Sequence, residues 1–235
     1  AYPLHVYYDF PMHEAIFWSG ALLPVVLHVL LGVTIVWAFS PLLPKAAGPL
    51  LFLLATLQPV MLAYNMAGRP DQQTLLLICL VLMLGGLVRE MKCLGAAPMS
   101  WSVWAGFCAG FGLWISPEFQ FAFIMVTATL GILWALRGER EVLHVVEGLG
   151  LGFFVVVAIG VLAERGGEWN TVRELDKISL PHALAAAINC GVWGFMPAFN
   201  YGGRLKRYLG LLVRGGLGAG FILFFAPELL RGPAG

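Results

Sequence analysis

Charged side chains are scarce in this chain. Asp, Glu, Lys and Arg make up 11% of the 235 residues, whereas ordinary globular domains carry about 25%. A water-soluble fold covers its surface with charge, and this chain has too little charge to do so. Hydrophobic residues make up 60%, and the mean hydropathy is +0.84. The composition predicts an all-α fold, a polytopic transmembrane helical bundle that forms a single transmembrane domain over residues 1–235.

Basic patches are also lacking, since the formal net charge is only +1. A protein that binds nucleic acid needs a stripe of Lys and Arg to neutralise phosphates, so no nucleic-acid partner is expected. The four cysteines form no Cys-x-x-Cys pair, and the sequence therefore predicts neither a zinc site nor a disulfide framework. The first residues lack the basic stretch and short apolar run of a signal peptide.

Two membrane cofactors are excluded by the positions of lysine and histidine. No lysine lies within a predicted span, so no retinal Schiff base is expected. Haem ligation between helices needs two histidines at matching depth. His28 lies near the middle of its span, whereas His144 and His182 lie near opposite ends of theirs, so no haem is expected either.

Long uncharged runs predict about eight membrane-spanning helices. They cover residues 15–39, 46–66, 72–88, 99–115, 119–136, 142–163, 180–198 and 208–226. Residues 116–118 interrupt a longer apolar stretch, and we interpret them as a tight turn, because Pro and a carboxylate are costly within the bilayer. Glycines at four-residue spacing, which permit close helix contact, are Gly106/Gly110, Gly148/Gly152 and Gly216/Gly220.

The loop cations predict the orientation in the membrane. If the N-terminus is outside, eight Lys and Arg residues lie in inner loops, namely Lys45, Arg89, Lys92, Arg137, Arg140, Arg204, Lys206 and Arg207. Five lie in outer segments, namely Arg69, Arg165, Arg173, Lys177 and Arg231. We therefore expect the N-terminus outside, which places Asp9, Asp71 and Glu118 on one outer face.

Two charged side chains, Glu147 and Arg214, fall inside predicted spans. They could pair across helices or extend to the membrane interface. We expect a structural role for both.

Three short polar segments interrupt apolar sequence at places expected to face outside, namely residues 8–14, 67–73 and 114–118. Carboxylates that converge from separate helix ends suit a hard divalent cation such as Mg²⁺ or Mn²⁺. Such a cation could neutralise a lipid-linked phosphate leaving group, and an arginine like Arg69 could hold the same phosphate. The alternative is that these are ordinary solvated loop carboxylates, because Pro-Asp is common in turns.

The polar segments also resemble a known family. Residues 68–76, GRPDQQTLL, resemble the G-R-x-D-H-H-x-L-x segment of GT-C-fold glycosyltransferases, in the bacterial branch related to the catalytic subunit of oligosaccharyltransferase. Residues 112–118, GLWISPE, resemble that branch's G-L-W-x-S-x-E. Residues 9–13, DFPMH, are similar to its D-G-x-x-M-H-W element, and residues 168–179 look like its later outer loop. The four segments occur in the family's order.

What the resemblance implies is an integral-membrane transferase of the bacterial inner membrane that uses a polyprenyl-(pyro)phosphate sugar donor. Asp71 takes the place of the family's second-loop acid, and Glu118 that of the S-x-E acid. The residues implied for catalysis and for holding Mg²⁺ or Mn²⁺ are Asp9, Asp71 and Glu118. The residues implied for substrate binding are His13, Arg69 and Gln72.

The chain departs from the family pattern in three places. The acidic D-D-x-x-R-type motif that opens the family's first outer loop has no counterpart here, Gln72 and Gln73 replace two histidines, and Glu14 follows His13 where Trp is usual. We therefore expect either a fragment of a longer transferase or a non-catalytic transmembrane structural subunit of a larger membrane complex. The expected partners are membrane lipids together with a lipid-linked sugar or other membrane subunits.

Overall fold

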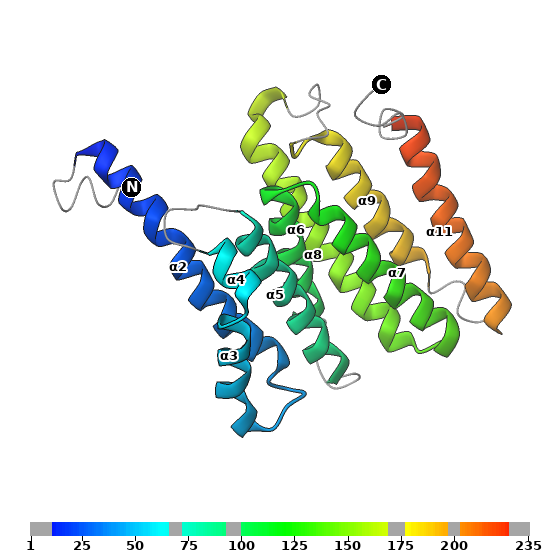
Figure 1. Cartoon of the computed structure of the whole chain (residues 1–235). Coiled ribbons are helices and arrows are strands. Elements are labelled where there is room, and N and C mark those ends of the chain that lie inside the picture. The colour runs from blue at the N-terminus through cyan, green and yellow to red at the C-terminus, as the bar shows by residue number, and fades with distance from the viewer. Residues whose placement is uncertain (1–10, 66–71, 93–99, 169–176, 197–202, 226–235) are drawn as a thin grey trace. The chain divides into compact units, whose positions relative to one another are not determined.

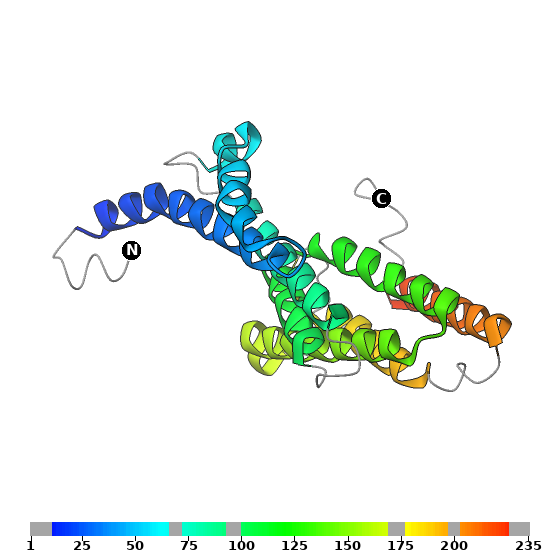
Figure 2. The same cartoon turned by 90° about the horizontal axis from the view of Figure 1, so that it is seen from below.

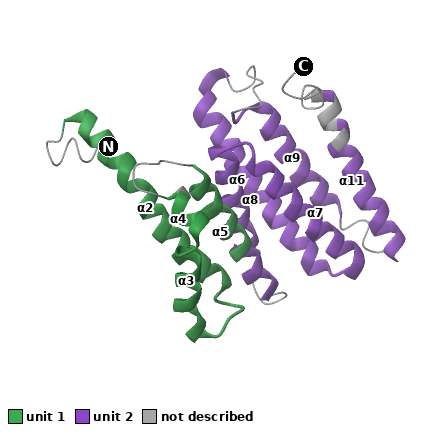
Figure 3. Cartoon of the chain, in the orientation of Figure 1, with its two compact units in different colours: residues 1–85 green, residues 86–235 purple. Residues whose placement is uncertain are grey.

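The computed structural model describes residues 11–65, 72–92, 100–168, 177–196 and 203–225 (Figure 1). These residues form helices joined by turns, and no strand occurs among them, so the predicted all-α fold is confirmed. Figure 2 shows the same helices from a second direction. The chain divides into two compact units, unit 1 (residues 1–85) and unit 2 (residues 86–235), shown in green and purple in Figure 3.

Four helical stretches in the described part of the chain are long and apolar enough to cross a membrane. They are Met12–Phe39 (α2), Gln73–Lys92 (α5), Phe119–Arg137 (α7) and Arg140–Glu168, which contains Arg140–Arg165 (α8). Their most apolar segments have mean hydropathies between 1.9 and 2.4. At about 1.5 Å per residue, each of them reaches or nearly reaches the roughly 30 Å of a bilayer core. These helices match an integral membrane protein, as predicted.

The predicted span 46–66 is not one helix. It is divided into Lys45–Ala47 (η1), Gly48–Thr56 (α3) and Pro59–Tyr64 (α4). Pro59 explains the break, because proline has no amide hydrogen to donate and disfavours the helical conformation in the residue before it. Gln58 accordingly has an extended backbone, with φ −64° and ψ 125°.

The remaining described helices are Ser100–Ile115 (α6), Leu180–Phe195 (α9) and Gly203–Phe225 (α11). α6 and α9 have 16 residues each, which is about 24 Å of helix. Both overlap predicted spans, and so does α11, which has 23 residues and begins with a basic turn.

Unit 1 is built around α2, against which α3 and the first half of α5 pack. Its apolar core includes Leu31 and Ala38 from α2 and Ile78 and Val81 from α5. His28 Nε2 lies 2.8 Å from the carbonyl oxygen of Thr56. Because α3 ends at Thr56, that carbonyl has no partner within its own helix, and the imidazole satisfies it. This contact gives His28 a structural role at the end of α3.

Unit 2 is built around α8, which contacts α6, α7 and α9, while α11 contacts α7 and α9. The closest approach is between α6 and α8, where Gly106 faces the backbone of Leu149, Gly152 and Phe153. A Cβ atom built at Gly106 would lie 2.9 Å from Gly152 Cα, so the two helices meet through their glycines. The close contact predicted from glycine spacing is confirmed for α6 and α8.

At each of the two ends of unit 2, a side-chain hydrogen bond joins neighbouring helices. At one end, where α6 and α8 finish and α7 and α9 begin, Trp114 Nε1 donates to Glu164 Oε1 at 2.6 Å. We call this the Glu118 end. At the other, α7 finishes and α8 and α11 begin, and Arg207 Nε donates to the carbonyl of Ala135 at 3.1 Å. We call this the Arg207 end. The described ends of these helices therefore lie at two ends of unit 2 (Figure 1).

Candidate functional site

Three of the six predicted site residues, Asp9, Arg69 and Asp71, lie outside the described residues. The other three are exposed, namely His13, Gln72 and Glu118. The His13 side chain is 82% exposed, and its Nε2 lies 3.9 Å from Glu14 Oε1. Within the described ranges, no three His, Cys, Asp or Glu side chains are grouped closely enough to hold a metal ion. The convergence of the three acids involves residues beyond those ranges and stays a prediction.

Glu118 occupies a tight turn between α6 and α7, as the sequence predicted. The turn is closed by hydrogen bonds from Ser116 N to the Gly112 carbonyl at 3.0 Å and from Phe119 N to the Ser116 carbonyl at 3.1 Å. Ser116 is buried, whereas Glu118 is exposed and its carboxylate does not cap α7. That carboxylate forms no ion pair with the described residues. A free carboxylate of this kind fits a hard divalent cation.

Hydrogen bonds and packing contacts to α8 stabilise the segment that carries Glu118. Trp114, which belongs to the same GLWISPE segment, donates its indole hydrogen to Glu164 at 2.6 Å. Its ring packs against Gly160, where a Cβ atom would lie 3.1 Å from the ring. One residue beyond Glu164, Arg165 Nε donates to the carbonyl of Ile178 at 3.2 Å. Sequence reasoning missed these contacts, because they join helices that are far apart along the chain.

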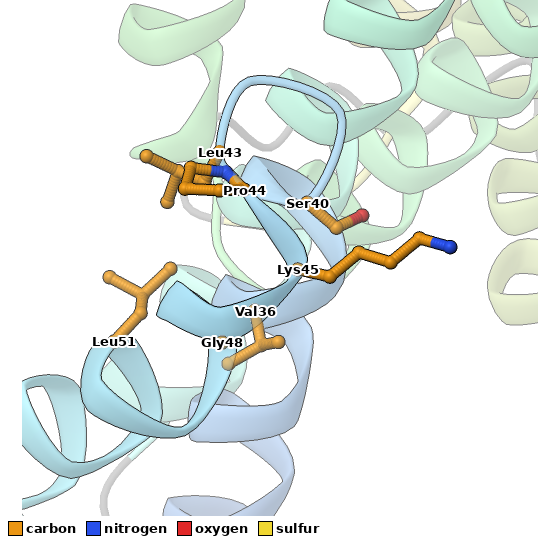
Figure 4. A pocket seen from close by; sticks show the side chains of 7 residues that line it. All are labelled: Val36, Ser40, Leu43, Pro44, Lys45, Gly48 and Leu51. Carbon is orange, nitrogen blue, oxygen red and sulfur yellow. The ribbon is translucent and has the colours of Figure 1, made fainter.

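Unit 1 contains a recess of about 190 Å³ at the corner between α2 and α3 (Figure 4). It is lined by Val36, Ser40, Leu43, Pro44, Lys45, Gly48 and Leu51. The lining is mainly hydrocarbon, and the ammonium group of Lys45 extends away from Leu43, Pro44 and Leu51 in Figure 4. Polar groups do not converge in the recess, so it offers no arrangement for catalysis.

The two charges expected inside the membrane do not pair with each other. Glu147 Oε2 lies 3.0 Å from Nδ1 of His144, one turn earlier on α8. Arg214 Nη2 donates to Asn189 Oδ1 at 2.6 Å, and its guanidinium lies 4.2 Å from the centre of the Trp193 ring. Each charge is therefore held by polar or aromatic groups, and the predicted alternative of a pair between the two is wrong. Extension of these side chains to the membrane interface stays a prediction.

The surroundings of Arg214 are rich in hydrogen-bond donors. Asn189 Nδ2 and Trp193 Nε1 are buried, and neither has an acceptor among the described residues. Arg214 forms no ion pair with a carboxylate of the described ranges. Buried donors without acceptors are uncommon in folded proteins, so the Arg214 cluster, which we define as Arg214, Asn189 and Trp193, is a second candidate site.

Glu90 has a structural role that the sequence did not reveal. Only 6% of its surface is exposed. Its Oε2 accepts hydrogen bonds from the amides of Trp101 and Ser102, each at 3.0 Å. These amides belong to the first turn of α6, where helical amides lack partners of their own. A carboxylate at this position also interacts favourably with the helix dipole.

Comparison with protein-family models, with curated proteins and with solved structures found no match to this chain. The resemblance to GT-C glycosyltransferases is therefore supported by the motif residues alone.

Proposed function

We propose that this protein is a GT-C-like integral membrane protein with eight spans, an outside N-terminus and a place in the bacterial inner membrane. It transfers a sugar from a polyprenyl-phosphate-linked donor at the outer membrane face. The observation that carries the proposal is the exposed carboxylate of Glu118, held in a turn that Trp114 anchors to Glu164. Both Trp114 and Glu118 belong to the segment that resembles G-L-W-x-S-x-E.

Each predicted site residue has a role in this proposal. Asp9, Asp71 and Glu118 would hold Mg²⁺ or Mn²⁺, since carboxylate oxygens are the preferred ligands of these hard cations. A divalent cation supplies electrostatic stabilisation to a phosphate leaving group. Arg69 would bind a phosphate of the donor through its planar guanidinium. The substrate-binding group also includes His13 and Gln72, whose exposed polar side chains would contact the donor.

The distribution of charge in unit 2 supports the orientation. Among the described residues of α7, α8 and α11 and the turns beside them, five cations lie at the Arg207 end, namely Arg137, Arg140, Arg204, Lys206 and Arg207. Among the described residues, two lie at the Glu118 end, namely Arg165 and Lys177. Because cytoplasmic loops carry the excess of Lys and Arg, this difference favours a Glu118 end that faces outside.

The test is sugar transfer by the purified protein in lipid vesicles, with a labelled polyprenyl-phosphate sugar and Mg²⁺ or Mn²⁺. Asp71→Asn and Glu118→Gln should each lower the rate about a hundredfold or more, the scale of lost electrostatic stabilisation. Glu139→Gln is the matched control, because Glu139 lies in the turn at the Arg207 end and its carboxylate does not cap α8. Rates in both site variants equal to the parent's would reject the catalytic assignment.

A specific feature of α11 favours the second candidate function, a non-catalytic transmembrane subunit. Gly215, Gly216, Gly218 and Gly220 have no neighbouring atom within 4 Å of a Cβ built on them. Small residues in a membrane helix allow another helix to approach closely. If the parent protein transfers no sugar with the donor and either cation, the subunit becomes the better explanation.

A further inference from the structure

The face of α11 that packs against the bundle ends at Arg214. Residues four and seven positions apart lie on the same face of a helix, so Arg207, Leu211, Arg214 and Gly218 share one. Arg207 donates to a carbonyl of α7, Leu211 lies against Gly131 of α7, and Arg214 contacts α9. The next residue, Gly218, has nothing within 4 Å. Arg214 therefore lies where the packed part of this face meets open space.

No carboxylate in the described part of the chain forms an ion pair with Arg214. A guanidinium carries five N–H donors, and the hydrogen bond to Asn189 Oδ1 is donated by Nη2. Asn189 Nδ2 and Trp193 Nε1 add two buried donors without acceptors in the described part of the chain. Both of these atoms are enclosed by the helix packing, whereas the guanidinium of Arg214 is only partly buried. Its positive charge is complementary to an oxyanion, which accepts several short, charge-assisted hydrogen bonds.

The neighbouring groups indicate the source of the anion. The first turn of α11 carries Arg204, Lys206 and Arg207. Basic residues near the membrane surface attract anionic lipids, and basic sites between transmembrane helices bind their headgroups. Arg214 lies seven residues beyond Arg207, about 10 Å along the helix, and side chains lean toward the helix N-terminus. Its guanidinium is thereby directed toward the level at which lipid phosphates lie.

Space for the hydrocarbon part of a lipid lies on the other side of Arg214. Gly215 and Gly218 have no neighbouring atoms within 4 Å of a built Cβ, so acyl chains can lie directly against this part of α11. We propose that Arg214, held in place by Asn189 and Trp193, binds the phosphate of an anionic phospholipid whose acyl chains lie along α11 at Gly218. This site is separate from the acids of the proposed function and does not depend on them.

The experiment measures lipid binding to the purified protein by native mass spectrometry, with phosphatidylglycerol and phosphatidylcholine of identical acyl chains. The parent should bind phosphatidylglycerol preferentially. Arg214→Gln should weaken that binding about tenfold, the effect of losing one charge-assisted contact. The matched control is Lys177→Gln, which removes an exposed cation at the Glu118 end of unit 2 and should change binding about twofold at most.

A second pair of variants tests the acyl-chain position without altering charge. Gly218→Leu fills the open space and meets no protein atom within 4 Å at its Cβ, and the same is true of Gly220→Leu. Because two residues correspond to about 200° around the helix, only Gly218→Leu should lower phosphatidylglycerol binding, by severalfold. If Arg214→Gln does not fold, the comparison of phosphatidylglycerol binding between Gly218→Leu and Gly220→Leu tests the proposal instead.

Four results would overturn the proposal. One is equal binding of the two lipids by the parent, and another is unchanged binding in both Arg214→Gln and Gly218→Leu. The third is displacement of phosphatidylglycerol by inorganic phosphate alone, which would identify a site for a free anion. A change of oligomeric state in Gly218→Leu without a change in lipid binding would assign this face to a second helix and would likewise reject the lipid.

Discussion

Replacing Gly106 by alanine should separate α6 from α8 and destabilise unit 2. A Cβ atom at this position would lie 2.7 Å from Phe153 N and 2.9 Å from Gly152 Cα, whereas ordinary contact begins at 3.4 Å. These neighbours are backbone atoms of α8, which cannot rotate away as a side chain can. The two helices must therefore move apart by several tenths of an ångström, and a gap approaching 1 Å already forfeits a quarter or more of each dispersion contact.

The expected loss of stability in Gly106→Ala follows from overpacking of the interface between α6 and α8. Inserting a methyl group into a close-packed interface costs about 1–3 kcal/mol of the free energy of unfolding. Gly216→Ala is the matched control, because a Cβ at Gly216 meets nothing within 4 Å. Alanine there should leave stability unchanged or raise it by up to about 1 kcal/mol, since alanine is the better helix former.

Reversible unfolding in mixed detergent micelles, followed by circular dichroism, compares the two variants directly. We expect Gly106→Ala to unfold at a lower fraction of denaturing detergent than the parent, and Gly216→Ala at the same fraction or a higher one. If the two variants are equally stable, the close contact between α6 and α8 is not what holds them together, and the reasoning is wrong.

Three further predictions concern topology and individual hydrogen bonds. A cysteine probe at Asn170 should be labelled by an impermeant reagent from outside and one at Gly203 should not; the reverse pattern would refute the orientation. Glu90→Gln should lower the free energy of unfolding by about 1–2 kcal/mol, because α6 loses a charged cap, while Glu139→Gln should change it little; equal effects would argue against the cap. Trp114→Phe removes the hydrogen bond to α8 and should cost about 1 kcal/mol, or about 2–4 °C in Tm; an unchanged Tm would show that this bond contributes nothing.

Helix positions could be predicted well from the sequence, because uncharged runs dominate it. The runs at 119–136 and 142–163 became α7 and α8 with ends that differ by at most two residues. The run at 46–66 was predicted wrongly as one helix. The run is apolar throughout, but Pro59 disfavours the helical conformation in the residue before it and so ends the preceding helical segment.

Side-chain partners could not be predicted in the same way. The pairing of Arg214 with Asn189 depends on how α9 and α11 are rotated relative to each other, and Lys and Arg patterns carry no information on that rotation. Glycine spacing predicted the contact of α6 with α8 but gave no reason why the similar pair in α11 has no neighbour. The acids of the predicted outer site lie partly outside the described residues, so their convergence is still to be measured.

The proposed function depends on one divalent cation shared by Asp71 and Glu118. Mn²⁺ loses the sharp paramagnetic resonance spectrum of the free ion when it binds, so a titration of the protein in vesicles counts the bound ions. We expect a single bound Mn²⁺ in the parent, and binding at least about tenfold weaker in Asp71→Asn and in Glu118→Gln, because each amide removes one charged ligand. Parent-like Mn²⁺ affinity in both variants would contradict a site formed by these two carboxylates.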